Sequence, residues 1–187
     1  MTLEEMMVKT LGLIEELTPN APMLTEDPDI EAKFYEVTNQ KMFELARIKK
    51  IPKYVELSVS AGDRITFEDI ERESGYQVYQ LDLITGINYQ SRAQGTVLKV
   101  IDGGTAEIDF FVYPERITAK TKPKAYEFEL SPDVLEIMPY GIAADLLKSD
   151  ISAEYGAVYS TAYEQMLSRL DPRYQQNTIY IESGMVI

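Results

Sequence analysis

Two runs of carboxylates come closer than any other residues of this sequence to a catalytic or metal-binding pattern. They are Glu26, Asp27, Asp29 and Glu31, and Glu68, Asp69, Glu71 and Glu73. Such clusters can hold a cation or supply the pair of acids that a glycosidase uses. Neither run has the spacing of a calcium-binding loop, and the first is explained by a helix start, where acids complement the helix dipole. We therefore expect no catalytic, cofactor-binding or metal site, and keep a carboxylate-based hydrolase as an alternative.

The amino-acid composition excludes several other chemistries. The chain of 187 residues contains no His, Cys or Trp. It therefore cannot form a Ser-His-Asp triad, a thiolate nucleophile, a disulfide or an ordinary zinc site. No glycine-rich nucleotide-binding motif occurs, so no bound nucleotide is expected.

The charge balance bears on the partners of the protein. Eighteen Lys and Arg residues against 31 Asp and Glu residues give a net charge of −13. This argues against direct binding to a nucleic-acid backbone, because that affinity comes from cations that displace counterions. The N-terminal residues lack the pattern of a signal peptide, and no run approaches about 18 apolar residues. We therefore expect no membrane contact and a protein that is made in the cytosol.

Hydrophobic periodicity predicts four helices, over residues 2–17, 27–50, 131–149 and 152–170. Each of the first two has a recognisable start. Thr2 with Glu5 is a capping box, and Asp27 followed by Pro28 is an N-cap with proline in the first turn. The third helix is apolar on nearly all its faces, so we expect it to be the most buried.

The periodicity changes to two at Tyr54 and predicts an inserted β element over about 54–118. Residues 64–75 receive no assignment. The predicted fold is α+β: a mainly helical bundle of about four helices, with an inserted small antiparallel sheet and an extended C-terminal tail. Residues 1–174 are expected to form a single domain, and residues 175–187 an extended C-terminal arm.

Several aromatic and apolar residues are candidates for contacts between subunits. Phe43 lies nearly opposite the main apolar arc of its helix, and the last helix carries a stripe of tyrosines. Tyrosine suits a surface that is wet in the monomer and buried in an assembly, although such a stripe is also typical of a core. The predicted interface residues are Phe43, Tyr155, Tyr159, Tyr163, Ile179, Tyr180 and Ile181.

Asp145 is a carboxylate on the apolar face of the third predicted helix. A buried charge without a partner would cost several kcal/mol. We therefore predict that Asp145 is a buried structural carboxylate paired with an arginine, with Arg47 and Arg169 as candidates. The alternative is that Pro139 kinks the helix and turns Asp145 toward solvent.

Three segments carry a resemblance to a known family. They are DPDIEAKFYEVTNQKMFELARIKKIPKY at 27–54, LSPDVLEIMPYGIAADLLKSD at 130–150 and LSRLDPRY at 167–174. Together they resemble the head-to-tail adaptor proteins of tailed bacteriophages, which bind beneath the portal ring. The resemblance covers the helical parts, and it covers the inserted strands by position alone.

This resemblance implies a non-enzymatic virion protein of the neck, made in the cytoplasm of the bacterial host. It implies a homo-oligomeric ring, about twelve-fold because the portal imposes its own symmetry. The partners would be the portal protein and a stopper or tail-completion protein. DNA would pass through the channel without sequence-specific binding, and carboxylates facing the lumen would keep it from sticking. Another neck or tail component, such as a stopper or tail-completion protein, remains an alternative, as does a monomeric binding module.

Overall fold

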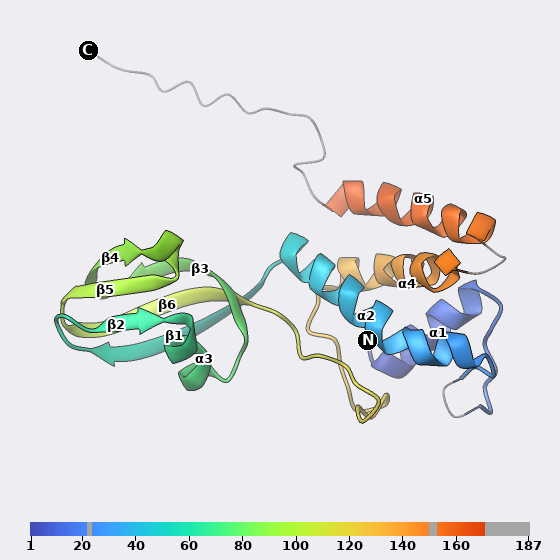
Figure 1. Cartoon of the computed structure of the whole chain (residues 1–187), viewed down its shortest axis with the longest axis horizontal. Coiled ribbons are helices and arrows are strands. Elements are labelled where there is room, and N and C mark those ends of the chain that lie inside the picture. The colour runs from blue at the N-terminus through green and yellow to red at the C-terminus, as the bar shows by residue number, and fades with distance from the viewer. Residues whose placement is uncertain (22–23, 150–152, 171–187) are drawn as a thin grey trace, which may run out of the picture.

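The computed structural model describes residues 1–21, 24–149 and 153–170, which form two lobes side by side (Figure 1). The helical lobe contains elements from both ends of the chain: α1 (Leu3–Leu13), α2 (Pro28–Ile48), α4 (Pro132–Leu146) and α5 (Ala153–Leu170). Two short 3₁₀ turns also occur, η1 (Ala93–Gly95) between strands of the other lobe and η2 (Leu147–Ser149) after α4. Over the described residues, no helix combines the length and apolar character needed to cross a bilayer.

Local signals set the starts of α1 and α2. Thr2 and Glu5 form a reciprocal capping box, with Glu5 Oε2 accepting from Thr2 N at 2.9 Å. Asp27 caps α2 by accepting from Asp29 N at 2.8 Å. The helix α1 ends at Leu13, earlier than the predicted residue 17, because Glu15 takes a left-handed φ of 61° and closes a Schellman turn.

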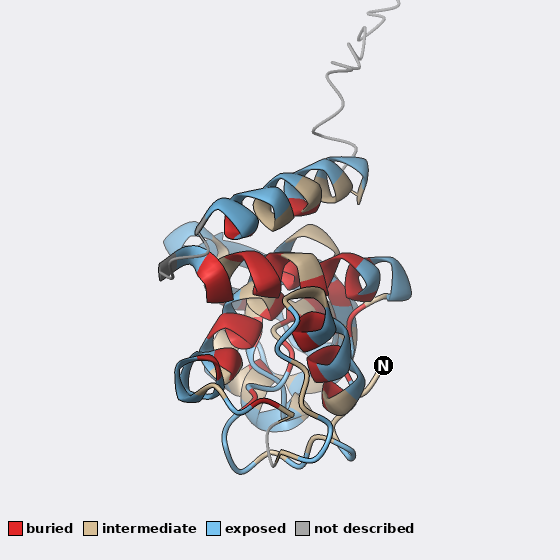
Figure 2. Cartoon of the chain, turned by 90° about the vertical axis from the view of Figure 1, so that its right-hand side faces the viewer, coloured by how far each residue is buried: buried red, intermediate tan, exposed pale blue. Residues whose placement is uncertain are grey.

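The core of the helical lobe lies where α1, α2 and α4 face one another (Figure 2). The helix α4 is the most completely covered, with ten of its fifteen residues buried, as its apolar pattern predicts. Pro139 lies inside this helix and is itself buried. The helix α5 is the outermost and exposes most of its surface.

The β lobe contains six strands in two antiparallel sheets. The first sheet has the order β1 (Ile51–Val59), β6 (Gly104–Val112), β3 (Val78–Thr85), and the second has the order β2 (Arg64–Thr66), β5 (Val97–Asp102), β4 (Asn88–Arg92). Their inner side chains belong to one buried cluster that includes Ile65, Leu98, Val100, Ile108 and Phe110. The strand β1 pairs with β6 along its whole length.

A short helix, α3 (Phe67–Ser74), lies in the segment to which the sequence analysis gave no assignment. Thr66 caps it, accepting from Asp69 N while the Asp69 carboxylate accepts from Thr66 N at 2.9 Å. Gly75 ends it at a φ of 75°. The eight residues of α3 bury only Ile70, which explains why hydrophobic periodicity does not reveal this helix.

The prediction of a mainly helical bundle with one inserted sheet is wrong. The described chain is a mixed α+β fold with five α-helices and two small antiparallel sheets of six strands in all. The physical reason is that the strands divide into two sheets whose inner apolar side chains are buried, so they form a lobe of their own instead of a small extension of the bundle. The β element spans 51–112 instead of 54–118, and the helices are shorter than predicted by one to four residues at most ends.

The chain returns from the β lobe to α4 through residues 113–131, which lie against the helical lobe. Asn39 of α2 is buried and binds this segment at two points: Nδ2 donates to Ile117 O at 2.7 Å, and Oδ1 accepts from Ile117 N at 2.8 Å. Leu3 N also donates to Tyr126 O at 3.0 Å. These bonds hold the returning segment on the bundle, so the described core of the helical lobe depends on both halves of the chain.

Candidate functional site

The predicted tyrosine stripe lies on α5, and the structure gives its three members different environments. Tyr163 is 5% exposed, Tyr159 is half-buried and Tyr155 is 69% exposed. The difference arises because α5 packs on α4 through the face that carries the buried residues Gly156 and Tyr163, and Tyr155 lies outside this contact. Figures 1 and 2 show α5 as the outermost helix of the lobe. The stripe is therefore partly core and partly surface.

Tyr163 belongs to the core of the helical lobe. Its hydroxyl donates to Glu44 Oε1 at 3.1 Å, and Lys41 Nζ lies 4.9 Å from the centroid of its ring. Burial, followed by the charge of Glu44 and the hydrogen bond to it, raises the pKa of Tyr163. Gly141 of α4 lets the ring approach closely, because a Cβ at this position would lie 2.8 Å from Tyr163 Cε2.

Asp145 lies beside Tyr163 in the same polar network. Its side chain is 19% exposed and its carboxylate lies 3.0 Å from Lys41 Nζ and 3.1 Å from Lys148 Nζ. Burial alone would raise the pKa of Asp145, but the hydrogen bonds from Lys41 and Lys148 hold it below its usual value. We refer to Lys41, Glu44, Asp145 and Tyr163 as the three-helix network, because it joins α2, α4 and α5.

The partner of Asp145 is a lysine, and the prediction of an arginine is wrong. Arg47 instead donates from Nε to Tyr113 Oη at 2.8 Å, and its guanidinium carbon lies 5.4 Å from the Tyr113 ring centroid. Lys41 precedes Arg47 by about one and two-thirds turns of α2, so the two side chains point to different sides of the helix. Lys41 is the one that faces α4.

Phe43 lies at the junction between the lobes. Its ring centroid is 5.3 Å from that of Tyr113, which in turn lies 4.6 Å from Tyr79 of β3. Tyr79 Oη donates to Ala46 O at 3.0 Å. Phe43 was predicted to face a second subunit because it points away from the bundle core, and the structure covers part of it with Tyr113 of the same chain.

A groove of about 370 Å³ opens beside the exposed end of α5. Its lining comes from three elements of the helical lobe and includes Leu13, Ile14, Glu15, Leu147, Tyr155 and Tyr159. Tyr159 Oη donates to Leu13 O and so fixes α5 against the end of α1. On the outward face of α5, Tyr155 and Val158 are 69% and 63% exposed, the highest values among the exposed large hydrophobic side chains of the described chain. We call the groove with Tyr155 and Val158 the α5 surface.

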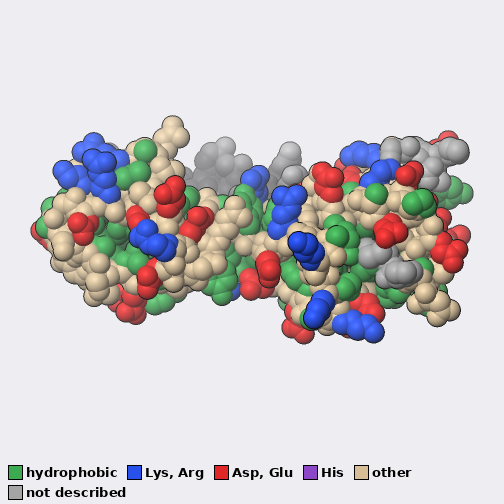
Figure 3. Space-filling view, turned by 60° about the horizontal axis from the view of Figure 1, so that its bottom comes forward, with side chains coloured by type: hydrophobic (Ala, Val, Ile, Leu, Met, Phe, Trp, Pro, Cys, Tyr) green, Lys and Arg blue, Asp and Glu red, His purple; other side chains and the backbone are tan. Residues whose placement is uncertain are grey.

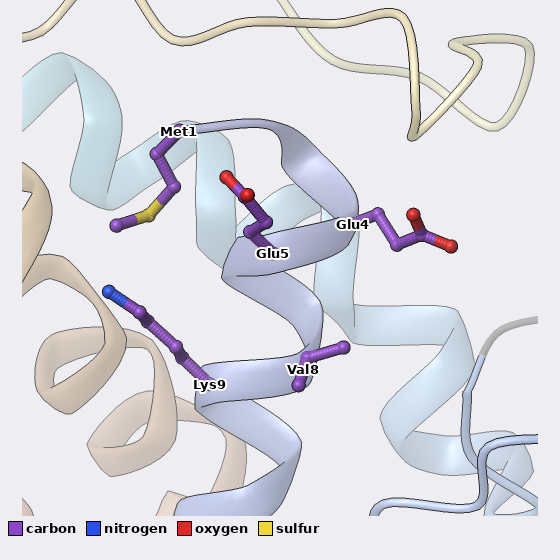
Figure 4. A pocket seen from close by; sticks show the side chains of 5 residues that line it. All are labelled: Met1, Glu4, Glu5, Val8 and Lys9. Carbon is purple, nitrogen blue, oxygen red and sulfur yellow. The ribbon is translucent and has the colours of Figure 1, made fainter.

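A second hollow, of about 380 Å³, lies over the outward face of α1 and is lined by Met1, Glu4, Glu5, Val8 and Lys9 (Figure 4). The side chains of Glu4 and Glu5 point to different sides of the helix (Figure 4). Glu5 is engaged in the capping box of α1, and Glu4 pairs with Lys124 at 3.6 Å. Both carboxylates therefore have structural partners and do not converge on one point.

One member of each acidic run is engaged in local structure. Asp27 caps α2, while Asp69 accepts from Thr66 and pairs with Arg72 at 2.7 Å. The hydrogen bonds from Thr66, helped by Arg72, lower the pKa of Asp69 despite its partial desolvation. Within the described part of the chain, no group of three or more acidic side chains is arranged to hold a metal ion.

The remaining predicted interface residues, Ile179, Tyr180 and Ile181, lie outside the described residues. The sequence analysis did not anticipate Val158, which lies three residues after Tyr155 on the same face of α5, nor the contribution of Leu13 and Ile14. The helical spacing of Tyr155 and Val158 is a signal that could have identified the pair. The sequence matches no protein-family model, and a search of curated proteins finds no match.

Proposed function

We propose that this protein is a structural component of a bacteriophage virion, a head-to-tail adaptor that forms a ring beneath the portal. It joins the portal to the stopper or tail-completion protein, and DNA passes through the ring without sequence-specific binding. This function is proposed because the helical segments resemble that family, and because the net charge of −13 suits a channel that must not hold DNA.

The observation that carries the proposal is the α5 surface. Two large apolar side chains are left in solvent beside a groove, on a helix that packs on one side only. Exposed apolar surface of this kind is typical of a protein-binding site. In this proposal the α5 surface binds the portal, and Tyr155 is its anchor. Tyrosine is enriched among the interface residues that contribute most of the binding free energy.

The experiment is a binding measurement between the purified protein and portal particles of the phage that encodes it. The test variant is Tyr155→Ser with Val158→Ser, and the matched control is Gln165→Ser, an exposed polar position of the same helix. Loss of an anchor costs about 2 kcal/mol, so we expect the test variant to bind about 30-fold more weakly. The control should bind like the unchanged protein.

Electron microscopy of the same mixture distinguishes the alternatives. An adaptor places a ring on the portal, whereas a stopper or tail-completion protein leaves the bare portal unoccupied and binds only after an adaptor is present. The proposed function would be overturned if the unchanged protein bound neither portal particles nor adaptor-bearing particles.

A further inference from the structure

The outer face of the β2-β5-β4 sheet is basic. Arg64 of β2 and Lys99 of β5 are direct partners across the ladder, and both alternate with the buried residues Ile65 and Leu98. They therefore point away from the core. Arg92 of β4 shares this face, because its partner in β5 lies two residues from Lys99. We call Arg64, Arg92 and Lys99 the basic face. In Figure 3, a cluster of Lys and Arg side chains is visible on the β lobe.

The outer face of the β1-β6-β3 sheet is acidic. Glu56 of β1 is the direct partner of Glu107 of β6, and Glu107 and Asp109 flank the buried Ile108. Tyr54 donates to Glu56 Oε1 at 2.8 Å. That hydrogen bond, with the nearby charges of Glu107 and Asp109, raises the pKa of Tyr54 to about 12. We call Glu56, Glu107 and Asp109 the acidic face.

Each face also exposes apolar side chains among its charges. On the acidic face, Tyr54 and Leu83 are both register partners of Asp109, and they are 52% and 55% exposed. On the basic face, Ile101 follows Lys99 by two residues and is 47% exposed. Each face therefore offers apolar area for contact as well as charge.

The charges of both faces are unfavourably placed within a single copy. Among the described residues, none of the six forms an ion pair, and like charges lie directly opposite each other at Arg64–Lys99 and Glu56–Glu107. Like charges at directly opposed strand positions destabilise a sheet. A partner of the opposite charge relieves this repulsion on either face.

We propose that the basic face of one copy docks on the acidic face of the next copy of this chain. The occupant is a second copy because one molecule carries both complementary surfaces, three cations on one side of the β lobe and three carboxylates on the other. The two sheets pack through their inner sides, so their outer faces point away from each other. A contact between two different faces repeats head to tail and closes into a ring when its rotation allows.

This inference rests on the proposed function only for the closure into a ring. It assigns the contact between neighbours to the β lobe, while the α5 surface stays free for the portal. Electrostatic complementarity of this kind fixes register and excludes wrong pairings.

The test uses two charge-reversed forms of the full chain. The basic-reversed variant carries Arg64→Glu, Arg92→Glu and Lys99→Glu. The acid-reversed variant carries Glu56→Lys, Glu107→Lys and Asp109→Lys. Self-association is followed by sedimentation velocity at low salt over a range of protein concentrations, with circular dichroism to verify folding. Each variant alone should associate at least about tenfold more weakly than the unchanged chain, and an equimolar mixture should associate again because it restores opposite faces.

Net charge is controlled within the design. Each reversal changes the charge by two units, so −13 becomes −19 in the basic-reversed variant and −7 in the acid-reversed variant. If net repulsion alone governed association, the acid-reversed variant would associate most readily, and this result would overturn the contact. A control variant with Lys9→Glu, Lys120→Glu and Lys122→Glu also has a charge of −19 but keeps both faces, and should associate more strongly than the basic-reversed variant.

The outcomes separate this contact from the proposed function. If the unchanged chain associates but the equimolar mixture of variants does not, the contact is overturned. Any ring would then form through another surface. An unchanged chain that stays monomeric at all concentrations also overturns the contact, while the portal-binding experiment decides the adaptor function independently. If a triple variant does not fold, the corresponding neutral variants, with Gln in place of each charged residue, must weaken association, or the contact is overturned.

Discussion

Replacing Lys41 with Met tests the three-helix network most directly. Methionine keeps an unbranched side chain against Tyr163 and Gly141, but removes the charge that pairs with Asp145 at 3.0 Å. The side chains of Lys41 and Asp145 are only 14% and 19% exposed, so solvent screens the pair weakly. Lys148 remains beside Asp145 but is itself 80% exposed.

The expected loss of stability in Lys41→Met lies between two known limits. Breaking a fully buried ion pair by removing one partner costs about 3–5 kcal/mol, and an exposed pair contributes about 0–1 kcal/mol. For a pair of this burial with one remaining lysine, we expect Lys41→Met to lower the free energy of unfolding by about 2 kcal/mol. For a chain of this length, that corresponds to a decrease in Tm of about 4–8 °C.

Urea denaturation followed by circular dichroism measures this change. The matched control is Lys124→Met, because Lys124 is 81% exposed and pairs with Glu4 only at 3.6 Å; its effect should stay within about 0.5 kcal/mol. Adding Asp145→Leu to Lys41→Met should recover stability, since an apolar pair can replace a buried ion pair. The reasoning is refuted if Lys41→Met costs no more than the control, or if the double variant loses the full sum of the two single effects.

The same pair makes a pH-dependent contribution. The folded-state pKa of Asp145 is below its unfolded value, so its contribution is present above the unfolded pKa of about 3.9 and is lost as the pH falls through the folded pKa. The difference in unfolding free energy between the unchanged protein and Asp145→Asn should therefore shrink below about pH 4. A difference that stays constant from pH 7 to the acid limit would contradict this assignment.

Three further predictions concern packing, ionisation and the tail. Gly141→Ala should lower the free energy of unfolding by about 1–3 kcal/mol, because the added Cβ meets the Tyr163 ring. Gly12→Ala should raise the free energy of unfolding by up to about 1 kcal/mol, because Gly12 lies near the end of α1 with open space around it. Urea denaturation measures both changes. Burial raises the pKa of Tyr163, so its contribution to stability should be complete below about pH 10 and lost as the pH rises through the folded pKa; a Tyr163→Phe variant should lack this alkaline dependence in urea titrations. Truncation before Gln175 should leave Tm unchanged but weaken binding to portal particles, and equal binding by the truncated chain would exclude a role for the tail in assembly.

The sequence alone determined the features that depend on neighbouring residues. The caps at Thr2 and Asp27 act within one turn, so the starts of α1 and α2 were predicted correctly. The near-complete burial of α4 follows from its apolar pattern, and the low exposure of Asp145 follows from its position on that helix. These features need no knowledge of the rest of the chain.

The tertiary structure decided everything that joins distant segments. Pairing of β2 with β5 makes the second sheet, and no local pattern shows that 64–66 pairs with 97–99. Lys41 is the partner of Asp145, 104 positions away, because the packing of α2 on α4 sets which cation is within reach. Phe43 is covered by Tyr113, which follows β6 and returns the chain to the bundle. In each case, bringing the two distant segments together costs conformational entropy, and the burial of the complete core offsets that cost. The contact therefore cannot be predicted from the local sequence around either partner.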